Sequence, residues 1–486
     1  MNEIELKHSI ESSIKAFLSG SISQNALNLF AKLGYKTDRQ NPFIEKTYRF
    51  FKESFLEPDT SFNEVKARVD DWKSIDLLFQ LTQEELSDQQ ILFGTKRVDN
   101  TIIETYLFFV IELIKTDYSR GALAQITREI NKIFPMPVML LFKYGEHLTL
   151  SVINRRLNKK DEQKDVLEKV TLIKDISIQN PHRAHIEILF DLSFDELKRN
   201  YKCTNFVELH NAWQKTLDTK ELNKKFYQKI FNWYLWAHKY VKFPQIRPKK
   251  DVIEDDQYQS ESLIRLITRL LFVWFMKEKR LVNSELFDCE KLKSILKDFK
   301  GVNGETTIYY KAILQNLFFA TINKPIEQRK IIDKGFNPKE YGDPLVYRYD
   351  ELFQKPNNLL KYFENIPFLN GGLFECLDQK KDNENPVEVR LDGFSTKIFK
   401  QAIFPDKLFF GKYANIDLSD VYNDKRKKNM TVFGIIDILN QHKFTIEENT
   451  PIEEEIALDP ELLGKVFENL LASYNPETKT TARKQT

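Results

Sequence analysis

Residues 260–282, SESLIRLITRLLFVWFMKEKRLV, constrain the fold more than any other stretch of the chain. Ser260 is expected to cap a long helix whose centre is apolar on every side. A helix without a polar face has to lie inside a helical assembly, because its apolar side chains would otherwise meet water. Its longest apolar run, residues 270–276, is much too short to cross a bilayer, so we expect no membrane partner.

The composition agrees with a mainly helical protein. Of the 486 residues, 42% are hydrophobic and 30% are charged, as in ordinary folded domains. The chain has 38 Phe but only 15 Gly, which favours long helices over a loop-rich β protein. We therefore predict an α+β fold that is predominantly helical, in which a small α+β module with an antiparallel sheet is followed by a helical connector domain.

Charge and cysteine content indicate where such a protein works. The formal net charge is +2, so any contact with nucleic acid has to come from local basic patches. Cys203, Cys289 and Cys376 lie far apart in sequence and form no metal-ligand spacing. The N-terminus also lacks a charged-then-apolar signal region, so we expect a cytoplasmic protein.

The first 200 residues divide into a helical region, residues 1–97, and an α+β module, residues 98–200. In the first region, residues 72–81 (WKSIDLLFQL) fit a helix or a strand equally well. In the module, helices are predicted at 102–114 and 122–134. Strands are predicted at 138–143, 148–155, 170–176 and 185–192, and the first two are joined by a hairpin at 144–147.

A helical connector is expected over residues 201–325 and an irregular, turn-rich region over 326–448. The aromatic residues of 226–240 are interpreted as core. In the turn-rich region, the paired glycines Gly371 and Gly372 permit positive φ and close backbone approach. Residues 425–428 (KRKK) form an exposed basic cluster.

Residues 449–486 are predicted to form a helix that leads out of the sequence. Asp459 stands at the N-cap position, Pro460 takes the first helical position, and Asn475-Pro476 ends the helix. The polar segment TTARKQT comes next, and we expect the chain to be a fragment of a longer protein, cut just before a further domain.

Six basic residues are candidates for contacting DNA. Arg155, Arg156, Lys159 and Lys160 come after the predicted hairpin, and a solvated loop would show the same charges, so both interpretations stay open. The other two, Arg265 and Arg269, lie one turn apart on the helix of residues 260–282.

Catalytic patterns are missing from the sequence. It contains no glycine-rich phosphate loop and no Asn-Pro-Pro-aromatic tetrapeptide, and its seven histidines are scattered. A metal-dependent nuclease would want Glu-x-Lys on a strand, but residues 64–66 (EVK) and 196–198 (ELK) fall in predicted helices. We therefore assign no catalytic, cofactor-binding or metal-binding residue.

Several stretches resemble one family closely, the large bacterial restriction-modification methylases of the single-chain (type IIG-like) kind. They are VDNTIIETYLFFVIEL (98–113), REINKIFPMPVMLLFKYG (128–145), RRLNKKDEQKDVLEKVTLIKDI (155–176), IRLITRLLFVWFMKEKRLV (264–282), PFLNGGLFE (367–375) and NTPIEEEIALDPELLGKVFENLLASYNPETKTTARKQT (449–486). The resemblance covers the N-terminal half of such proteins and implies a parent that methylates adenine N6 in DNA, in phage defence. It also implies that the S-adenosylmethionine site comes directly after Thr486.

Three hypotheses for the function are open. The first is the N-terminal, DNA-contacting part of such a methylase, with double-stranded DNA as partner and S-adenosylmethionine as the parent's cofactor. The second is a non-enzymatic DNA-binding or assembly scaffold for a separate methylase or nuclease subunit. The third is a divergent endonuclease domain, which alone would require Mg²⁺.

Overall fold

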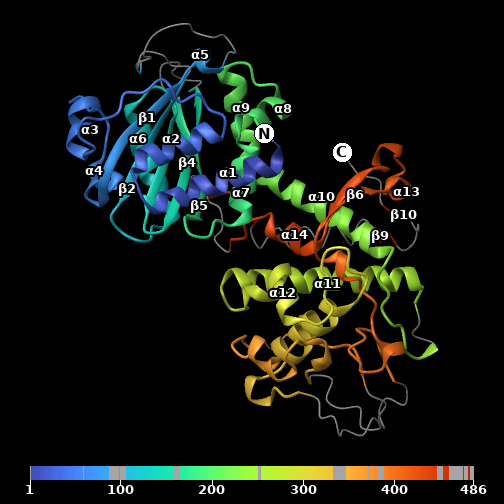
Figure 1. The fold of residues 1–486 in the computed structure, drawn as a ribbon. Helices are drawn as coiled ribbons and strands as arrows, with labels where there is room; N and C mark the ends of the chain where they lie inside the picture. The colour runs from blue at the N-terminus through green and yellow to red at the C-terminus, as the bar shows by residue number, and fades with distance from the viewer. Residues whose placement is uncertain are drawn as a thin grey trace. The chain divides into compact units, whose positions relative to one another are not determined.

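The computed structural model describes residues 2–58, 60–86, 98, 105–157, 165–249, 253–331, 346–369, 371–379, 388–445, 453–458, 474–475 and 480–481 (Figure 1). The chain forms two compact units, Met1–Lys224 with Asn440–Asp459 and Lys225–Leu439 with Pro460–Thr486. The α+β class is confirmed, since many helices accompany one large sheet. The five ranges predicted from the sequence are a finer division than these two units, and they stay a prediction.

The first unit is built on a six-stranded mixed sheet in the order β1-β2-β3-β4-β5-β8. The strands pair antiparallel except for β2 with β3 and β5 with β8, which are parallel. The prediction of an antiparallel sheet is therefore wrong in these two pairs. The strands are β1 (Trp72–Leu81), β2 (Tyr106–Leu113), β3 (Val138–Tyr144), β4 (His147–Leu157), β5 (Asp165–Ser177) and β8 (Glu453–Glu455).

The helix predicted at 102–114 is wrong, because Tyr106–Leu113 is the strand β2. Alternate residues of β2 enter two different cores, with Phe108 and Val110 on one face and Phe109 and Ile111 on the other. The sequence of a strand that is covered on both faces is a continuous run of apolar residues, and its periodicity cannot be distinguished from that of a buried helix. Residues 72–81, which the sequence left open, form the strand β1.

The strand predicted at 185–192 is also wrong. Residues Arg183–Asp191 form helix α7, and His182 caps it by accepting a hydrogen bond from the Ala184 amide at 3.0 Å. The predicted hairpin is confirmed, since β3 pairs antiparallel with β4. Its turn requires Gly145, because φ is +49° and an added Cβ would lie 3.0 Å from the Thr116 carbonyl oxygen.

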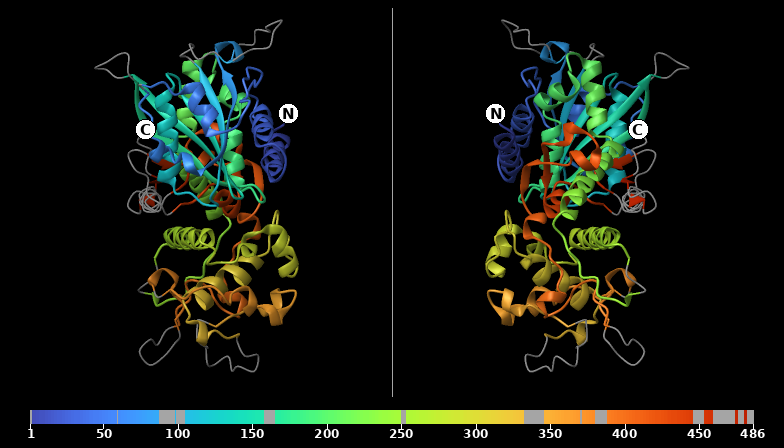
Figure 2. Two further views of the ribbon diagram at one scale, coloured as in Figure 1. Left: turned by 90° about the vertical axis from the view of Figure 1, so that its left-hand side faces the viewer. Right: turned by 90° about the vertical axis from the view of Figure 1, so that its right-hand side faces the viewer.

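Helices cover both faces of the sheet (Figure 2). One core lies under α1 (Glu3–Lys15), α2 (Ile22–Lys32), α7, α8 (Phe194–Tyr201) and α9 (Phe206–Thr216). The other lies under α3 (Tyr48–Phe55), α4 (Glu64–Ala67) and α6 (Arg120–Ile133). The first unit also contains α5 (Gln83–Leu86) and the 3-10 turns η1 (Ala16–Leu18) and η2 (Val69–Asp71).

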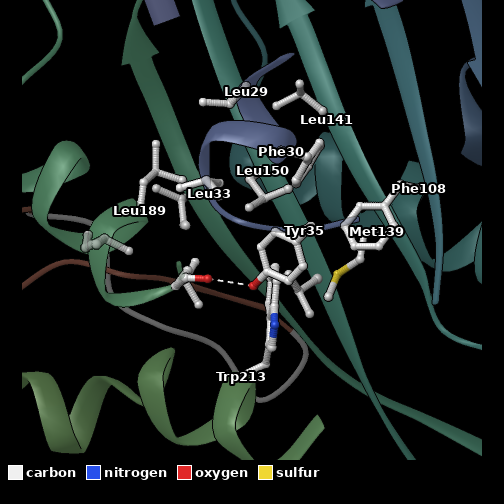
Figure 3. Packing of buried hydrophobic residues seen from close by; sticks show 14 of the residues in the cluster. Leu29, Phe30, Leu33, Tyr35, Phe108, Met139, Leu141, Leu150, Leu189 and Trp213 are labelled. Atoms are coloured by element: carbon white, nitrogen blue, oxygen red, sulfur yellow. Dashed lines mark hydrogen bonds between the residues drawn. The ribbon is translucent and has the colours of Figure 1, made fainter. Parts of the chain in front are cut away.

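Tyr35 lies in the middle of the first of these cores (Figure 3). Its ring contacts Phe30, Phe108 and Trp213 at centroid distances of 5.9–6.4 Å. Its hydroxyl donates a hydrogen bond to the Leu192 carbonyl oxygen at 2.5 Å, so α7 is tied to the centre of the core.

The second unit is mainly helical. Its longer elements are α10 (Thr219–His238), α11 (Asp255–Glu278), α12 (Cys289–Ile295), the π-helix η5 (Tyr310–Ile322) and α14 (Ile435–Asn440). A two-stranded sheet pairs β6 (Lys412–Ile416) with β7 (Met430–Phe433), and β9 (Tyr474–Asn475) pairs with β10 (Thr480–Thr481). The shorter turns and helices are η4 (Ser284–Phe287), η6 (Ile326–Gln328), η7 (Asp350–Leu352), η8 (Pro356–Asn358), η9 (Leu360–Tyr362), η10 (Gly372–Phe374), η11 (Ile398–Lys400), η12 (Asp406–Leu408), α13 (Ser419–Tyr422) and η13 (Lys425–Lys427).

The buried helix predicted around residues 260–282 is confirmed as α11. Buried residues lie on all its sides, among them Leu263, Ile267, Leu270 and Trp274. Ser260 is not its cap, however. The helix begins at Asp255, and the Ser260 hydroxyl donates to the carbonyl oxygen of residue 256 at 2.9 Å.

The π-helix η5 lies within the range predicted as a helical connector, and its turns are wider than those of an α-helix. The Asp406 carboxylate holds its start, accepting hydrogen bonds from the Tyr309 amide at 2.9 Å and from the Thr306 hydroxyl at 2.6 Å. Burial raises the pKa of Asp406 to about 6.

Gly371 and Gly372 do not have the role that their pairing suggested. Gly371 is extended, with φ of −169°, and a Cβ added to either glycine would meet nothing within 4 Å. The closing helix predicted at 459–474 lies outside the described residues, apart from Tyr474 in β9. Among the described helices, none is long and apolar enough to span a membrane.

Candidate nucleic-acid interface

Strands β4 and β5 extend past the rest of the sheet as a two-stranded ribbon. The pairing of β3 with β4 reaches only Leu140↔Ser151, whereas β4 and β5 stay paired as far as Leu157↔Asp165. On the other side, β8 pairs with β5 only at residues 170–172. In the described part of the chain, residues 155–157 and 165–167 therefore pair only with each other, and we call them the β4–β5 ribbon.

Two of the predicted DNA-contacting residues lie in this ribbon. Arg155 is paired with Leu167 and Arg156 with Val166, just beyond a register shift between Ile153 and Arg155. Such an irregularity bends and twists a strand pair. Lys159 and Lys160 lie outside the described residues, in the segment that joins the two strands.

The root of the ribbon is fixed by polar contacts to β8. Glu454 accepts a hydrogen bond from the Thr171 hydroxyl at 3.0 Å and forms an ion pair with Lys169. Glu453, next to it, lies 3.6 Å from the buried Arg120 of α6. Strand β8 is thus held both to the root of the ribbon and to helix α6.

Arg269 lies in a different setting from the one that its sequence position suggested. Its side chain is only 3% exposed, and its Nη1 donates to the Asp392 carboxylate at 2.9 Å. Nε and Nη2 donate to the carbonyl oxygens of Leu373 and Glu375, each at 2.8 Å. This burial is at odds with a contact to DNA, and the guanidinium instead holds the PFLNGGLFE stretch.

Arg265, one turn earlier on α11, is partly accessible. Its side chain is 27% exposed, and Nη1 lies 3.9 Å from the same Asp392 carboxylate. The two arginines share one carboxylate and lie at different depths. The spacing of the arginines in sequence did not reveal the carboxylate partner, because Asp392 is 123 residues from Arg269.

A polar cluster at one end of the sheet was missed by the sequence analysis. Glu112 of β2 binds Lys73 of β1 at 3.1 Å and Lys143 of β3 at 3.3 Å. In the strand register, Asp76 pairs with Val110 and Glu112 pairs with Lys143, so Asp76, Glu112 and Lys143 share one face. Lys73 lies in the register shift between Trp72 and Ser74.

Asp76 is the buried member of this cluster. It accepts hydrogen bonds from the Phe43 amide at 2.9 Å and the Ser23 hydroxyl at 2.5 Å, and Lys46 lies 2.9 Å away. The signal for this cluster was four charged residues on three strands, two of them on β1, and a search for a contiguous triplet cannot find it. Both carboxylates are already bound by lysines, and the described residues contain no group of three or more His, Cys, Asp or Glu placed to hold a metal ion.

The two Glu-x-Lys triplets lie in helices, as predicted. Glu64 begins α4 and accepts hydrogen bonds from Tyr48 and Lys52, which hold its pKa below the usual value. Glu196 lies in α8 and pairs with Arg199. Neither triplet lies on a strand beside another acidic residue.

The basic cluster of residues 425–428 begins as the 3-10 turn η13 between α13 and β7. Lys425, Arg426 and Lys428 are exposed, and Arg426 Nε lies 3.0 Å from Asp424.

His182 and His185 are neighbours in the first unit, with ring centroids 6.1 Å apart. Burial lowers the pKa of His185 well below its usual value, so His185 is neutral.

Comparison with known proteins gives one distant relative. It is described as "Putative type II restriction enzyme and methyltransferase", from Methanocaldococcus jannaschii, and is 25% identical over 208 residues. The alignment covers 43% of this chain but only 12% of that protein. No family model and no solved structure matches the chain. The chain is thus distantly similar, over 208 residues, to a protein named for restriction and methylation.

Proposed function

We propose that this chain is the N-terminal, DNA-contacting part of a single-chain restriction-modification enzyme. The observation that carries the proposal is the alignment of 208 residues with a protein named for both restriction and methylation. That protein is several times longer than the aligned region, so it has room for further domains. The parent would be a cytoplasmic, site-specific methyltransferase that acts on adenine N6 of double-stranded DNA.

The β4–β5 ribbon supports a contact with duplex DNA. A two-stranded ribbon fits the major groove, and Arg and Lys neutralise phosphates on either side of it. Four basic residues, Arg155, Arg156, Lys159 and Lys160, belong to the ribbon or to the segment between its strands. The contacts of Lys169 and Thr171 to Glu454 fix the root of the ribbon, so the ribbon would resist bending when it binds DNA.

The chemistry of the parent would lie outside these 486 residues. A methyltransferase of this kind flips the target adenine out of the duplex and transfers the methyl group from S-adenosylmethionine. By the family resemblance, the cofactor site comes after Thr486. The ribbon would therefore position DNA, and it would take no part in methyl transfer.

Duplex binding measured over a salt series tests this proposal. A variant with charge reversals at Arg155, Arg156, Lys159 and Lys160 is compared with K291E/K293E, which reverses two exposed charges on α12. We expect the ribbon variant to bind at least about tenfold more weakly. The slope of log K against log salt should become shallower by about 3.6, because each of four lost phosphate contacts contributes about 0.9. Unchanged affinity with an unchanged slope would rule out the ribbon as the contact.

A second candidate is a Mg²⁺-dependent endonuclease, favoured by the cluster of Asp76, Glu112 and Lys143 on adjacent strands. Metal binding there would require Glu112 to exchange a lysine for the ion. Plasmid incubated with a high excess of the chain and Mg²⁺ decides the matter, with Glu112→Gln as the matched variant. If the plasmid stays intact, this candidate is removed.

The scaffold and methylase hypotheses predict different codons downstream of Thr486. A stop codon directly after Thr486 would favour a separate scaffold subunit. A continuation with a Gly-containing aromatic-Thr-Pro segment would favour the single-chain methylase. Both hypotheses retain the DNA contact, so the salt series tests them alike.

A further inference from the structure

An exposed apolar tip lies on the turn η11 of the second unit. Ile398 is 84% exposed and Phe399 is 76% exposed, the highest values among the large hydrophobic residues in the described part of this unit. The centroid of the Phe399 ring lies 5.6 Å from Lys400 Nζ, but most of the surface of both side chains is in water and gains nothing from packing within the chain. Their position therefore suggests a role outside the folded chain.

The turn that carries this tip is well braced. The Ser395 amide donates to the Tyr349 hydroxyl at 3.2 Å, and the Gln401 side chain donates to the Ser395 carbonyl oxygen at 2.8 Å. Phe394 and Ala402, on either side, are buried. Ile398 and Phe399 are thus presented by a fixed turn between two buried anchors.

An ion-pair cluster adjoins the tip and braces it. The Glu388 carboxylate is bound by Lys400 and, at 2.9 Å, by Arg390, and these two basic side chains are buried, at 8% and 7% exposed, so they fix the turn and do not reach a ligand. Burial acts to raise the pKa of Glu388, but the hydrogen bond from Lys400 and the charge of Arg390 outweigh it and lower the pKa. The carboxylate is therefore ionised and held by its cations.

Two further lysines flank the tip. Lys397 precedes Ile398 directly, and the exposed Lys242 pairs through its backbone with Ile403, at 2.9 and 2.8 Å. An apolar tip beside these two lysines, neither of which is buried, is complementary to a polyanion that also has apolar surfaces. Duplex DNA has both, because its phosphates line grooves whose floor is stacked bases.

The size of the tip argues against a protein partner. Two side chains of this kind offer about 300 Å² of apolar surface, whereas a stable protein interface needs about 800 Å² on each side. A small projecting pair matches the apolar wedges with which DNA-bending proteins open a base step from the minor groove. We infer that Ile398 and Phe399 insert between base pairs of duplex DNA and kink it; this rests on the proposed DNA-contacting function.

End-to-end energy transfer in a short duplex labelled at both ends tests the inference with the full 486-residue chain. Saturation with the wild-type chain should increase energy transfer, as a kink of at least about 20° brings the ends closer. The variant I398S/F399S should still bind, about tenfold more weakly, but leave the duplex straight. F399W should retain the bend, and Ile326→Ser, at a half-exposed site of the same unit, should behave as wild type.

The outcomes separate this inference from the proposed function. If the wild-type chain binds without a change in energy transfer, or if I398S/F399S bends the duplex as wild type does, the wedge is overturned and the DNA contact stands. If sedimentation shows that I398S/F399S abolishes self-association while bending is unchanged, the tip docks a second copy and the wedge is again overturned. If the wild-type chain binds no duplex at all, the proposed function itself fails.

Discussion

Arg269 and Asp392, 123 residues apart in the chain, form a buried ion pair in which Nη1 lies 2.9 Å from Oδ1. Each side chain is only 3% exposed. The same guanidinium donates to two carbonyl oxygens of the PFLNGGLFE stretch, and Asp392 accepts a further hydrogen bond from the Leu377 amide. This pair joins the long helix α11 to a region that has little regular structure.

Removal of Arg269 should destabilise the second unit strongly. In R269A the Asp392 charge stays buried without its partner, and we expect a loss of about 3–5 kcal/mol in the free energy of unfolding. R265A is the control, because Arg265 is partly exposed and lies 3.9 Å from the same carboxylate; it should cost about 1 kcal/mol or less. Urea unfolding measures the free energy of unfolding of both variants. Equal losses would contradict the finding that Arg269 is buried and Arg265 is partly exposed.

Tyr35 offers a matched test in the first unit. Tyr35→Phe removes the hydrogen bond to the Leu192 carbonyl oxygen, which should cost about 1–2 kcal/mol. Tyr35→Ala also opens a cavity between Phe30, Phe108 and Trp213 and should cost about 3–5 kcal/mol. Tyr240→Phe, at a site that is 42% exposed, should change stability by less than about 0.5 kcal/mol. If Tyr35→Phe has as small an effect as this control, the hydrogen bond contributes nothing.

Local patterns in the sequence predicted the elements whose partners are close in the chain. The hairpin of β3 and β4 was predicted because Gly145 lies between two apolar runs. Helix α11 was predicted because its apolar residues cannot face water on any side. Strand β2 was mistaken for a helix, since a strand buried on both faces has no alternation to reveal it.

Other features depend on partners that no local pattern contains. The three glutamates of β8 have low strand propensity, and they are a strand because they pair with residues 170–172 of β5. Arg269 was wrongly predicted to contact DNA, because its buried partner Asp392 is 123 residues away and the local sequence gives no sign of it. The cluster around Glu112 was missed for the same reason, since its charges come from three strands.

The contacts of Glu454 should control how often β8 detaches from the sheet. Glu454→Ala leaves the buried Thr171 hydroxyl and Lys169 without their carboxylate, at a cost of about 1–3 kcal/mol. The Ile456 amide, which donates to the Leu172 carbonyl oxygen at 2.9 Å, should then exchange its hydrogen faster. Hydrogen exchange read by mass spectrometry measures this, with Glu305→Ala at an exposed ion pair as the control. Equal exchange in the two variants would mean that strand pairing alone holds β8.

Asp406 should make the stability of the second unit depend on pH in the direction opposite to that of most carboxylates. Burial raises its pKa from 3.8 to about 6 in the folded chain, against hydrogen bonds from Thr306 and Tyr309 that lower it. Between these two values the folded state binds more protons than the unfolded state, so the contribution of this group to stability falls as pH rises from about 4 to about 6. The loss amounts to about 3 kcal/mol, at 1.36 kcal/mol for each pKa unit.

Asp406→Asn removes this titration and keeps an oxygen that accepts the bond from the Tyr309 amide. The variant should therefore gain stability relative to wild type by about 3 kcal/mol between pH 4 and pH 7. Asp424→Asn is the control of opposite sign, because the hydrogen bond from Arg426 lowers the pKa of the partly exposed Asp424. Urea unfolding at several pH values measures the difference from wild type. If that difference for Asp406→Asn is independent of pH, the buried carboxylate is ionised throughout and its hydrogen bonds outweigh its burial.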